Sequence, residues 1–386
     1  MALPLKYNVR NLSVRWVTTL MTVGGIALVT FIFVTIFALG IGLERTLTGT
    51  GHPRNMIVLR KNATETQSRI TREQAQELES SFEGIDRDET GTTMVSRELL
   101  ALANLFKADG KRANVALRGV GPMARKVRDG ITVVEGTWFE PNLGQLVVGK
   151  AARDRFAGLR IGDTPTFRGR QWKVVGVFDA GGQAYESEVW GHIDDFQAQF
   201  KGEYSTLIVR CKDEATIERL SNVVAEDKKL QLEGKPHAKY YADQNMGVLM
   251  IKVLAVIMGI VLSIGAVFGA ANTMYAAVSS RTREIATIRF LGFGRGAVWF
   301  SFMLEAAFMG LIGGVAGGLL SYFTINGMKT GTANWDTFSE IAFQFRVTPL
   351  LILGGTILAI IMAVVGGLLP AWRASRTTIA HALRGF

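Results

Sequence analysis

The 386-residue sequence is poor in the residues and motifs that most enzymes and metal proteins depend on. Its one cysteine, Cys211, excludes a disulfide framework and a cysteine-based zinc site, and is most simply a small buried residue. The four histidines lie far apart with no HxxxH pair, so no histidine metal site is expected. The sequence contains no GxxxxGK[ST] phosphate loop, nucleophile elbow or HExxH motif. These absences exclude P-loop nucleotide hydrolysis and argue against the common hydrolase classes.

Apolar residues, by contrast, are abundant. They make up 48% of the chain against 20% for charged residues, which indicates a protein divided between membrane and water. A helix needs about 20 mainly apolar residues to cross a bilayer. Four segments meet that length and are expected to be transmembrane helices: 17–43, 246–280, 296–328 and 347–372. The first is too long for a signal-peptide core and lacks a cleavage site of small residues, so we interpret it as a retained anchor.

The excess of positive charge lies in three short segments outside these helices. The N-terminal segment 1–16, the connection 281–295 and the tail 373–386 each carry more Lys and Arg than Asp and Glu, whereas region 44–245 and loop 329–346 are nearly balanced. Short basic segments stay in the cytoplasm. We therefore expect both termini and the connection inside, and the large polar region outside. Because no basic face is left over, nucleic-acid binding is not expected despite the net charge of +10.

The polar region 44–245 is long enough for one or two folded units with cores of their own. Strands are expected at 55–59, 92–106, 113–120, 206–210 and 237–241, and helices at 71–82 (with Thr71 as N-cap) and 213–227. We expect the flanking parts, 51–120 and 200–245, to form one α+β layer, and 121–199 to be an inserted β-rich subdomain. The predicted fold class is a membrane α-helical protein, with one helix before and three after an extracytoplasmic α+β domain.

Small residues recur at close spacing in the expected membrane helices. Residues four apart lie on one helix face, and small side chains there let two helices approach closely. The residues concerned are Gly265, Gly269, Gly310, Gly313, Gly314, Gly317 and Gly318. Two interpretations stay open: packing within one bundle, and a contact face for a second copy of the chain.

Two ionisable residues fall within the expected membrane helices, Lys252 and Glu305. Ionisable groups in a membrane are functional candidates by default. For Lys252, extension of the side chain towards the outer surface is a sufficient explanation. For Glu305, we favour a polar partner in the helix bundle over a role in transport. Two isolated charges make a poor proton relay, so an ion-coupled carrier is disfavoured.

The connection between the second and third expected helices contains the most informative motif, SSRTREIATIRFLGFG at 279–294. Ile285, Ile288 and Leu291 recur at helical spacing, charged residues occupy other positions, and Gly292 ends the pattern. This pattern predicts a short amphipathic helix. Such a helix either lies on anionic lipid or docks into a groove of a cytoplasmic partner.

Several stretches together carry a family resemblance. The segment 278–320, VSSRTREIATIRFLGFGRGAVWFSFMLEAAFMGLIGGVAGGLL, resembles the ABC transporter permeases of the MacB/FtsX type, whose pattern is ERTREIG-x-LRALG, then Leu-Glu-Ala and a glycine-rich span. Ser280 replaces the first acid of that pattern and Phe290 its alanine. Segments 8–28 and 368–385 are similar to the family's opening and closing motifs, and 119–178 to its periplasmic core domain.

The resemblance implies a permease of the bacterial inner membrane that pairs with a second permease, as a homodimer or with a sister chain. A separate cytoplasmic ATPase would bind ATP and Mg²⁺, so no catalytic residue, metal or cofactor is expected on this chain. The outer parts 51–120 and 200–245 would be porter-like. The residues that match the motif, with Arg281 beside them, would form the coupling helix in the ATPase groove: Arg281, Arg283, Glu284, Ile285, Ile288, Arg289, Leu291 and Gly292.

The function expected from this resemblance is the permease subunit of an ATP-driven exporter. It would work by mechanotransmission, in which the membrane helices pass ATP-driven movement to the outer domains, which expel or extract an amphiphilic cargo. One alternative is a signalling permease of the cell-division type that regulates an extracytoplasmic hydrolase, and another is a passive membrane-anchored sensor or binding protein. The helix expected at 281–292 disfavours the passive receptor. The sequence leaves the cargo and the participation of a periplasmic adaptor open.

Overall fold

The computed structural model describes residues 16–200, 203–243, 246–333 and 339–376. They fall into two compact units. The helical unit comprises residues up to Ile41, Leu249–Met328 and the residues from Phe345 onward, and the sheet unit comprises Gly42–Val248 and Lys329–Gln344. The expected N-terminal segment 1–16 lies almost wholly outside the described residues, as does most of the tail 373–386.

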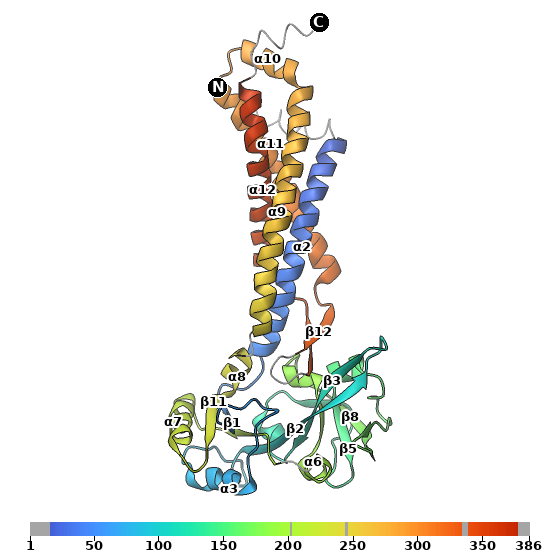
Figure 1. Cartoon of the computed structure of the whole chain (residues 1–386), viewed down its shortest axis with the longest axis vertical. Helices are drawn as coiled ribbons and strands as arrows, with labels where there is room; N and C mark the ends of the chain where they lie inside the picture. The colour runs from blue at the N-terminus through green and yellow to red at the C-terminus, as the bar shows by residue number, and fades with distance from the viewer. Residues whose placement is uncertain (1–15, 201–202, 244–245, 334–338, 377–386) are drawn as a thin grey trace. The chain divides into compact units, whose positions relative to one another are not determined.

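Four long helices form the helical unit (Figure 1): α2 (Trp16–Thr48), α9 (Met246–Ser280), α11 (Arg295–Ile325) and α12 (Pro349–Ser375). All four are long and apolar enough to cross a membrane. Local signals set some of their ends. The Thr348 hydroxyl accepts a hydrogen bond from Leu351 N–H and Pro349 occupies the first turn of α12, which is where proline is tolerated.

Close approach between these helices depends on the glycines of α11. A Cβ atom added at Gly314 would lie 2.7 Å from the Cα of Thr356 on α12, and Gly310 meets α12 in the same way. Gly313 faces Ile26 of α2. Of the other two, Gly318 abuts α12 and Gly317 abuts α2. Alternate glycines of α11 therefore admit two different neighbours, which is packing within one bundle.

The two glycines of α9 are different. A Cβ added at Gly265 or at Gly269 would meet no atom of the described chain within 4 Å. The bundle-packing role considered for these two residues is thus not found within this chain, because their face of α9 points away from the other helices.

This contrast yields a matched pair of variants. We expect Gly314→Ala to lower the stability of the detergent-solubilised protein by about 1–3 kcal/mol, because the new methyl group collides with backbone that cannot rotate away. Gly265→Ala adds the same methyl group to a helix interior with open space around it. Thermal unfolding in detergent measures both. Equal unfolding temperatures for the two variants would contradict the close contact between α11 and α12.

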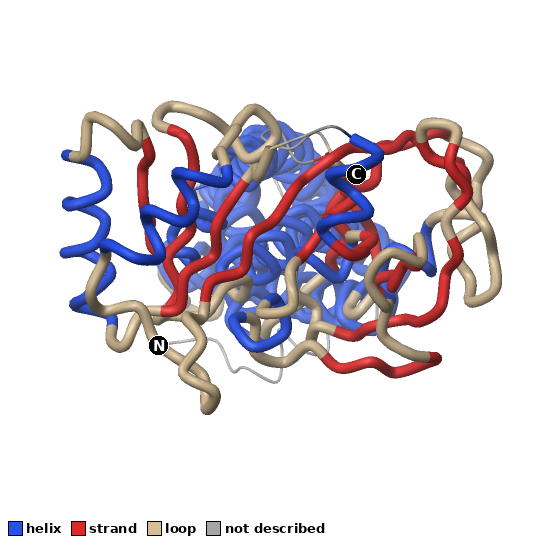
Figure 2. Tube along the Cα trace, turned by 90° about the horizontal axis from the view of Figure 1, so that it is seen from below, coloured by secondary structure: helices blue, strands red, loops and turns tan. Residues whose placement is uncertain are grey.

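The sheet unit is built on one nine-stranded sheet with the order β11-β1-β10-β2-β3-β9-β5-β8-β4. Figure 2 shows its strands as a twisted red band. The strands are β1 (Asn55–Arg60), β2 (Val95–Phe106), β3 (Arg112–Val120), β4 (Thr132–Gly136), β5 (Gln145–Gly149), β8 (Lys173–Asp179), β9 (Val189–His192), β10 (Thr206–Arg210) and β11 (Leu232–Pro236). Two small hairpins accompany it, β6 (Thr166–Phe167) with β7 (Arg170–Gln171), and β12 (Lys329–Ala333) with β13 (Glu340–Gln344). The helices are α3 (Arg72–Ser81), α4 (Ala124–Val127), α5 (Lys150–Arg155), the 3-10 helix η1 (Ala184–Ser187), α6 (Ile193–Phe200), α7 (Glu214–Glu226) and α8 (His237–Asp243).

The two ends of the polar region form one layer, as the sequence predicts. Strand β1 pairs antiparallel with β10 and β11, and β10 pairs antiparallel with β2, so β1-α3-β2 and β10-α7-β11 interlock as two split βαβ units. Thr71 caps α3 in a full capping box with Gln74, which confirms its predicted role.

The prediction of a strand at 237–241 is wrong. That segment is helix α8, and the strand lies just before it, at Leu232–Pro236. His237, Tyr240 and Tyr241 are the buried residues of α8. Their spacing of three and four residues matches one face of a helix, and Pro236, which has no N–H to continue a ladder, ends the strand.

The inserted segment 121–199 is rich in strands, as expected, but it adds to the existing sheet. β3 pairs in parallel with β9, and β9 pairs with β5, so the sheet runs on without a break. One apolar core accordingly includes Leu117 of β3, Val148 of β5 and Leu207 of β10. The long hairpin β2–β3 makes this possible, because it belongs to both parts of the sheet.

Candidate functional site

The predicted amphipathic helix is present as α10 (Thr282–Phe290), a nine-residue helix between α9 and α11. Gly292 follows it with a φ of 94°, a left-handed conformation that glycine adopts without strain. The Leu291 N–H bonds back to the carbonyl of Thr287, which closes the last turn.

A buried ion pair attaches the start of α10 to α11. Arg281 Nη1 lies 2.9 Å from Glu305 Oε2, and the two side chains are only 4% and 7% exposed. Glu305 thus has a polar partner in the helix bundle, which is the interpretation that the sequence favours. Arg281 cannot present its guanidinium to another protein while it makes this pair, so its proposed place on the docking face requires correction.

The apolar residues of α10 divide between inside and outside. Ile285 is 3% exposed and packs in a cluster with Val298 and Phe302 of α11, and Ile288 packs against the same cluster. Phe290 and Leu291 are 77% and 70% exposed. Ile285 therefore lies on the side of the predicted docking helix that packs against α11, and is not on its outer surface. Only one side of the short helix α10 faces the bundle, and α11 packs against that side.

The charged residues of the motif lie nearer the surface. Arg283 and Glu284 are exposed, Arg289 is half-buried, and Gly292 is exposed. Lys252, the other ionisable residue singled out above, is half-buried near the start of α9. The surface available around α10 thus consists of its polar side and its C-terminal end, with Phe290, Leu291 and Gly292.

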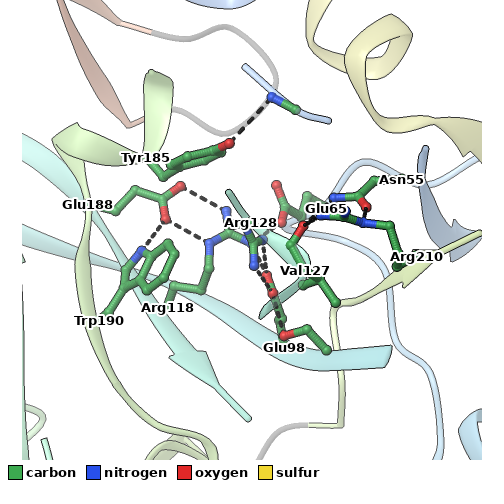
Figure 3. Close-up of polar contacts among 12 residues, drawn as sticks. Asn55, Glu65, Glu98, Arg118, Val127, Arg128, Tyr185, Glu188, Trp190 and Arg210 are labelled. Atoms are coloured by element: carbon green, nitrogen blue, oxygen red, sulfur yellow. Dashed lines mark hydrogen bonds and ion pairs between the residues drawn. The ribbon is translucent and has the colours of Figure 1, made fainter. Parts of the chain in front are cut away.

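A second concentration of polar groups lies inside the sheet unit (Figure 3). Arg118 of β3 donates two hydrogen bonds to Glu188, of 2.7 and 2.8 Å, and one of 3.0 Å to Glu98 of β2. It also pairs with Glu65. Arg118, Glu65 and Glu98 are at most 2% exposed. Burial raises the pKa of Glu65, a shift that the guanidinium of Arg118 opposes.

Arg128, at the end of α4, extends this cluster. It pairs with Glu98, and its guanidinium lies 5.2 Å from the centre of the Trp190 ring. Burial raises the pKa of Glu98, but Arg128 and Arg118 together lower it by more, to about 2. Nearby His237 is fully buried, and burial together with the charge of Arg128 lowers its pKa to about 3, which keeps the imidazole neutral.

Within the same unit, helix η1 is bonded to two segments that are distant from it in sequence. Thr50 Oγ1, just past α2, accepts a hydrogen bond from Ala184 N–H, and Gly51 N–H donates to Tyr185 Oη. Ala342 N–H of β13 donates to Ser187 Oγ. Helix η1 therefore contacts residues 50–51 and strand β13, all of which belong to the sheet unit. Sequence reasoning missed the buried cluster around Arg118, although the charged residues Glu98 and Arg118 inside the apolar strands β2 and β3 were a signal.

One long apolar helix, a mixed α/β domain and three further apolar helices define a polytopic membrane protein with a large soluble domain. Residues 19–226 match the model of the MacB-like periplasmic core domain, and residues 256–379 match that of the FtsX-like permease C-terminal region. The chain belongs to the MacB/FtsX family of ABC transporter permeases.

Two relatives found by sequence agree with this assignment. An ABC transporter permease of Methanocaldococcus jannaschii is 26% identical over 272 residues, which cover 66% of each chain. The macrolide export ATP-binding/permease protein MacB of Escherichia coli is 27% identical over 304 residues, covering 73% of this chain and 45% of that protein. The chain therefore matches less than half of the length of the latter. The periplasmic region of MacB from Actinobacillus actinomycetemcomitans superposes with a TM-score of 0.37 at 14% identity, over 53% of this chain and 98% of that one.

Proposed function

We propose that this permease is the membrane subunit of an ATP-driven exporter, and that a separate ATPase binds it at α10. The observation that carries the proposal is the construction of α10. One side of the helix is held to α11 by the Arg281–Glu305 pair and by Ile285, while Phe290 and Leu291 are left exposed at its end. Exposed large apolar side chains at the end of an amphipathic helix are the kind of anchor with which such a helix docks into a groove.

The contacts of the helical unit suggest how movement would spread from α10. A displacement of α10 acts on α11 through the buried ion pair and the Ile285 contacts. At its glycines, α11 packs too closely against α12 and α2 for these helices to slide past one another. A movement of α11 therefore carries α12 and α2 with it. Helices α2 and α9 both continue into the sequence of the sheet unit. This is mechanotransmission, and it needs no polar path for cargo through the membrane.

The proposal extends to partners and placement. ATP and Mg²⁺ would bind the ATPase, and this chain would supply no cofactor site or catalytic residue. The basic segments 1–16, 281–295 and 373–386 support a cytoplasmic location for the termini and α10, in a bacterial inner membrane with the sheet unit outside. A second permease, of the same or a sister sequence, would complete the transporter. The cargo would be an amphiphile handled by the outer domains, with or without a periplasmic adaptor.

The test removes the exposed apolar pair. Phe290→Ala together with Leu291→Ala is expected to weaken binding of the co-expressed ATPase by roughly tenfold to a hundredfold, because both side chains would be buried at the interface. Co-purification of the ATPase with the solubilised permease measures this. Phe323→Ala is the matched control, because Phe323 is equally exposed at 79% but lies on α11.

A second variant separates protein docking from lipid contact. Glu284→Lys adds positive charge, which a helix lying on anionic lipid tolerates and an ATPase groove fitted to this charge pattern does not. If the double variant accumulates normally and keeps its ATPase at the wild-type ratio, the coupling assignment fails.

A further inference from the structure

The free edge of β2 is the feature of the sheet unit that neither the fold nor the proposed coupling accounts for. β2 has 12 residues, but its neighbour β10 pairs only with Val95–Glu98. The residues that precede β10 do not continue this pairing, because Tyr204 exchanges two backbone hydrogen bonds with Ile70 and not with β2. Among the described residues, the remainder of β2 is paired with β3 alone, on its other side.

The hydrogen-bond register shows which backbone groups point to this edge. Glu98 accepts from Ser205 N–H, Leu100 N–H donates to Ser205 Oγ, and Phe106 accepts from Ala157 N–H. N–H and C=O groups of alternate residues share one side of a strand, so those of Leu102 and Asn104 point the same way. Within the described residues no backbone partner is found for them. The open stretch is bounded by Ser205 at one end and Ala157 at the other.

A groove runs along the Ser205 end of this edge. It encloses a cavity of about 290 Å³. Its lining includes Leu100 and Leu102 of β2, Phe200, Arg69, Arg168 and Glu203. That volume is close to the lower limit of about 300 Å³ for ligand pockets and suits a few side chains rather than a large molecule.

The charge of the groove is unbalanced. Arg69 Nη1 donates only to the carbonyls of Thr66 and Ser68, and the Arg168 guanidinium lies 4.9 Å over the ring of Phe200. Neither forms an ion pair within the described residues, and Glu203 is the one carboxylate in the described lining. Two cations against one anion favour a ligand with negative charge.

We propose that the open edge of β2 binds an extended peptide segment of a partner protein, which adds a strand beside Leu100–Asn104. An acidic side chain or terminal carboxylate of that peptide lies against Arg69 and Arg168. An extended backbone supplies hydrogen-bond partners for the N–H and C=O groups of Leu102 and Asn104. Leu102, 37% exposed, offers an apolar contact to one side chain of the peptide. A strand edge without a partner can pair with other chains and cause aggregation, so proteins usually cover it or make pairing there unfavourable.

The test uses the full chain in detergent micelles and two hexapeptide libraries of alternating Val or Ile and Thr, one ending in Asp and Glu, the other in Lys. We expect acidic peptides to bind and to slow hydrogen exchange of the Leu102 and Asn104 amides by roughly tenfold or more at saturation. Basic peptides should not. A backbone N-methylated form of a bound acidic peptide should bind at least about tenfold more weakly, because it cannot donate to the edge.

Variants examine the charge requirement separately. Arg69→Gln with Arg168→Gln should weaken acidic peptides by roughly tenfold, and Arg72→Gln, an exposed arginine on α3 away from the groove lining, should leave them unchanged. The proposal is overturned if no acidic peptide protects these amides at about 1 mM, or if N-methylation does not affect binding. These measurements involve no ATPase, so their outcome is independent of the proposed coupling at α10.

Discussion

Arg118→Met is expected to lower the free energy of unfolding of the sheet unit by about 3–5 kcal/mol, the range for removing one partner of a buried ion pair. The methionine has a similar volume, so the loss comes from electrostatics. It leaves Glu65, Glu98 and Glu188 in the interior with Arg128 as the one arginine that pairs with them among the residues described. Hydrogen exchange of β2 and β3 against urea concentration, in the detergent-solubilised full chain, measures the change.

Two further variants test the cause. Lys126→Met removes a 2.6 Å pair with Asp88 in which the lysine is 52% exposed, and should cost far less than Arg118→Met because solvent screens the charge of the lysine. Adding Glu65→Gln to Arg118→Met should restore part of the stability by removing one uncompensated carboxylate. Unchanged exchange of β2 and β3 in Arg118→Met would show that the cluster contributes little to stability.

Reversing one charge of the Arg281–Glu305 pair is expected to produce the largest defect in the helical unit. Arg281→Glu places two carboxylates together in a buried site, and Glu305→Arg places two guanidinium groups there. Each should cost about 3–5 kcal/mol and detach α10 from α11. The double exchange restores opposite charges and should recover most of both unfolding temperature and ATPase binding, measured on the solubilised complex.

Arg283→Glu provides the positional control. Arg283 lies two residues further along and is exposed, so its reversal should leave the unfolding temperature nearly unchanged. Recovery of the unfolding temperature and of ATPase binding in the double exchange would identify the Arg281–Glu305 pair as the contact that holds α10 to α11. A double exchange no more stable than either single variant would mean that the two residues act separately.

Much of the architecture could be predicted from local sequence. The four long helices could be predicted from runs of apolar residues, because a helix needs about 20 mainly apolar residues to cross a bilayer. The capped helix α3, the hairpin β2–β3 and strand β10 follow from capping and turn signals that span a few residues. The segment 237–241 shows the limit, because HAKYY is compatible with a strand until Pro236 is weighed as its end.

The candidate sites depend on contacts between distant segments. The motif around α10 indicated a docking helix, but whether Ile285 or Leu291 faces outward is decided by α11, which covers one side. Glu305 finds its partner 24 residues away and Arg118 bonds to Glu188 70 residues away. Local periodicity carries no information about such pairings.

The sequence by itself determined the class of protein, the number of membrane helices, the helix at α10 and the family, because each depends on composition or on short motifs. Only the tertiary structure decided which faces are covered. It buried Arg281 and Ile285, joined the insertion to a single sheet through β3 and β9, and left part of β2 without a neighbour. The physical reason is that exposure is a property of the assembled neighbours of a residue, and those neighbours come from segments far apart in the chain.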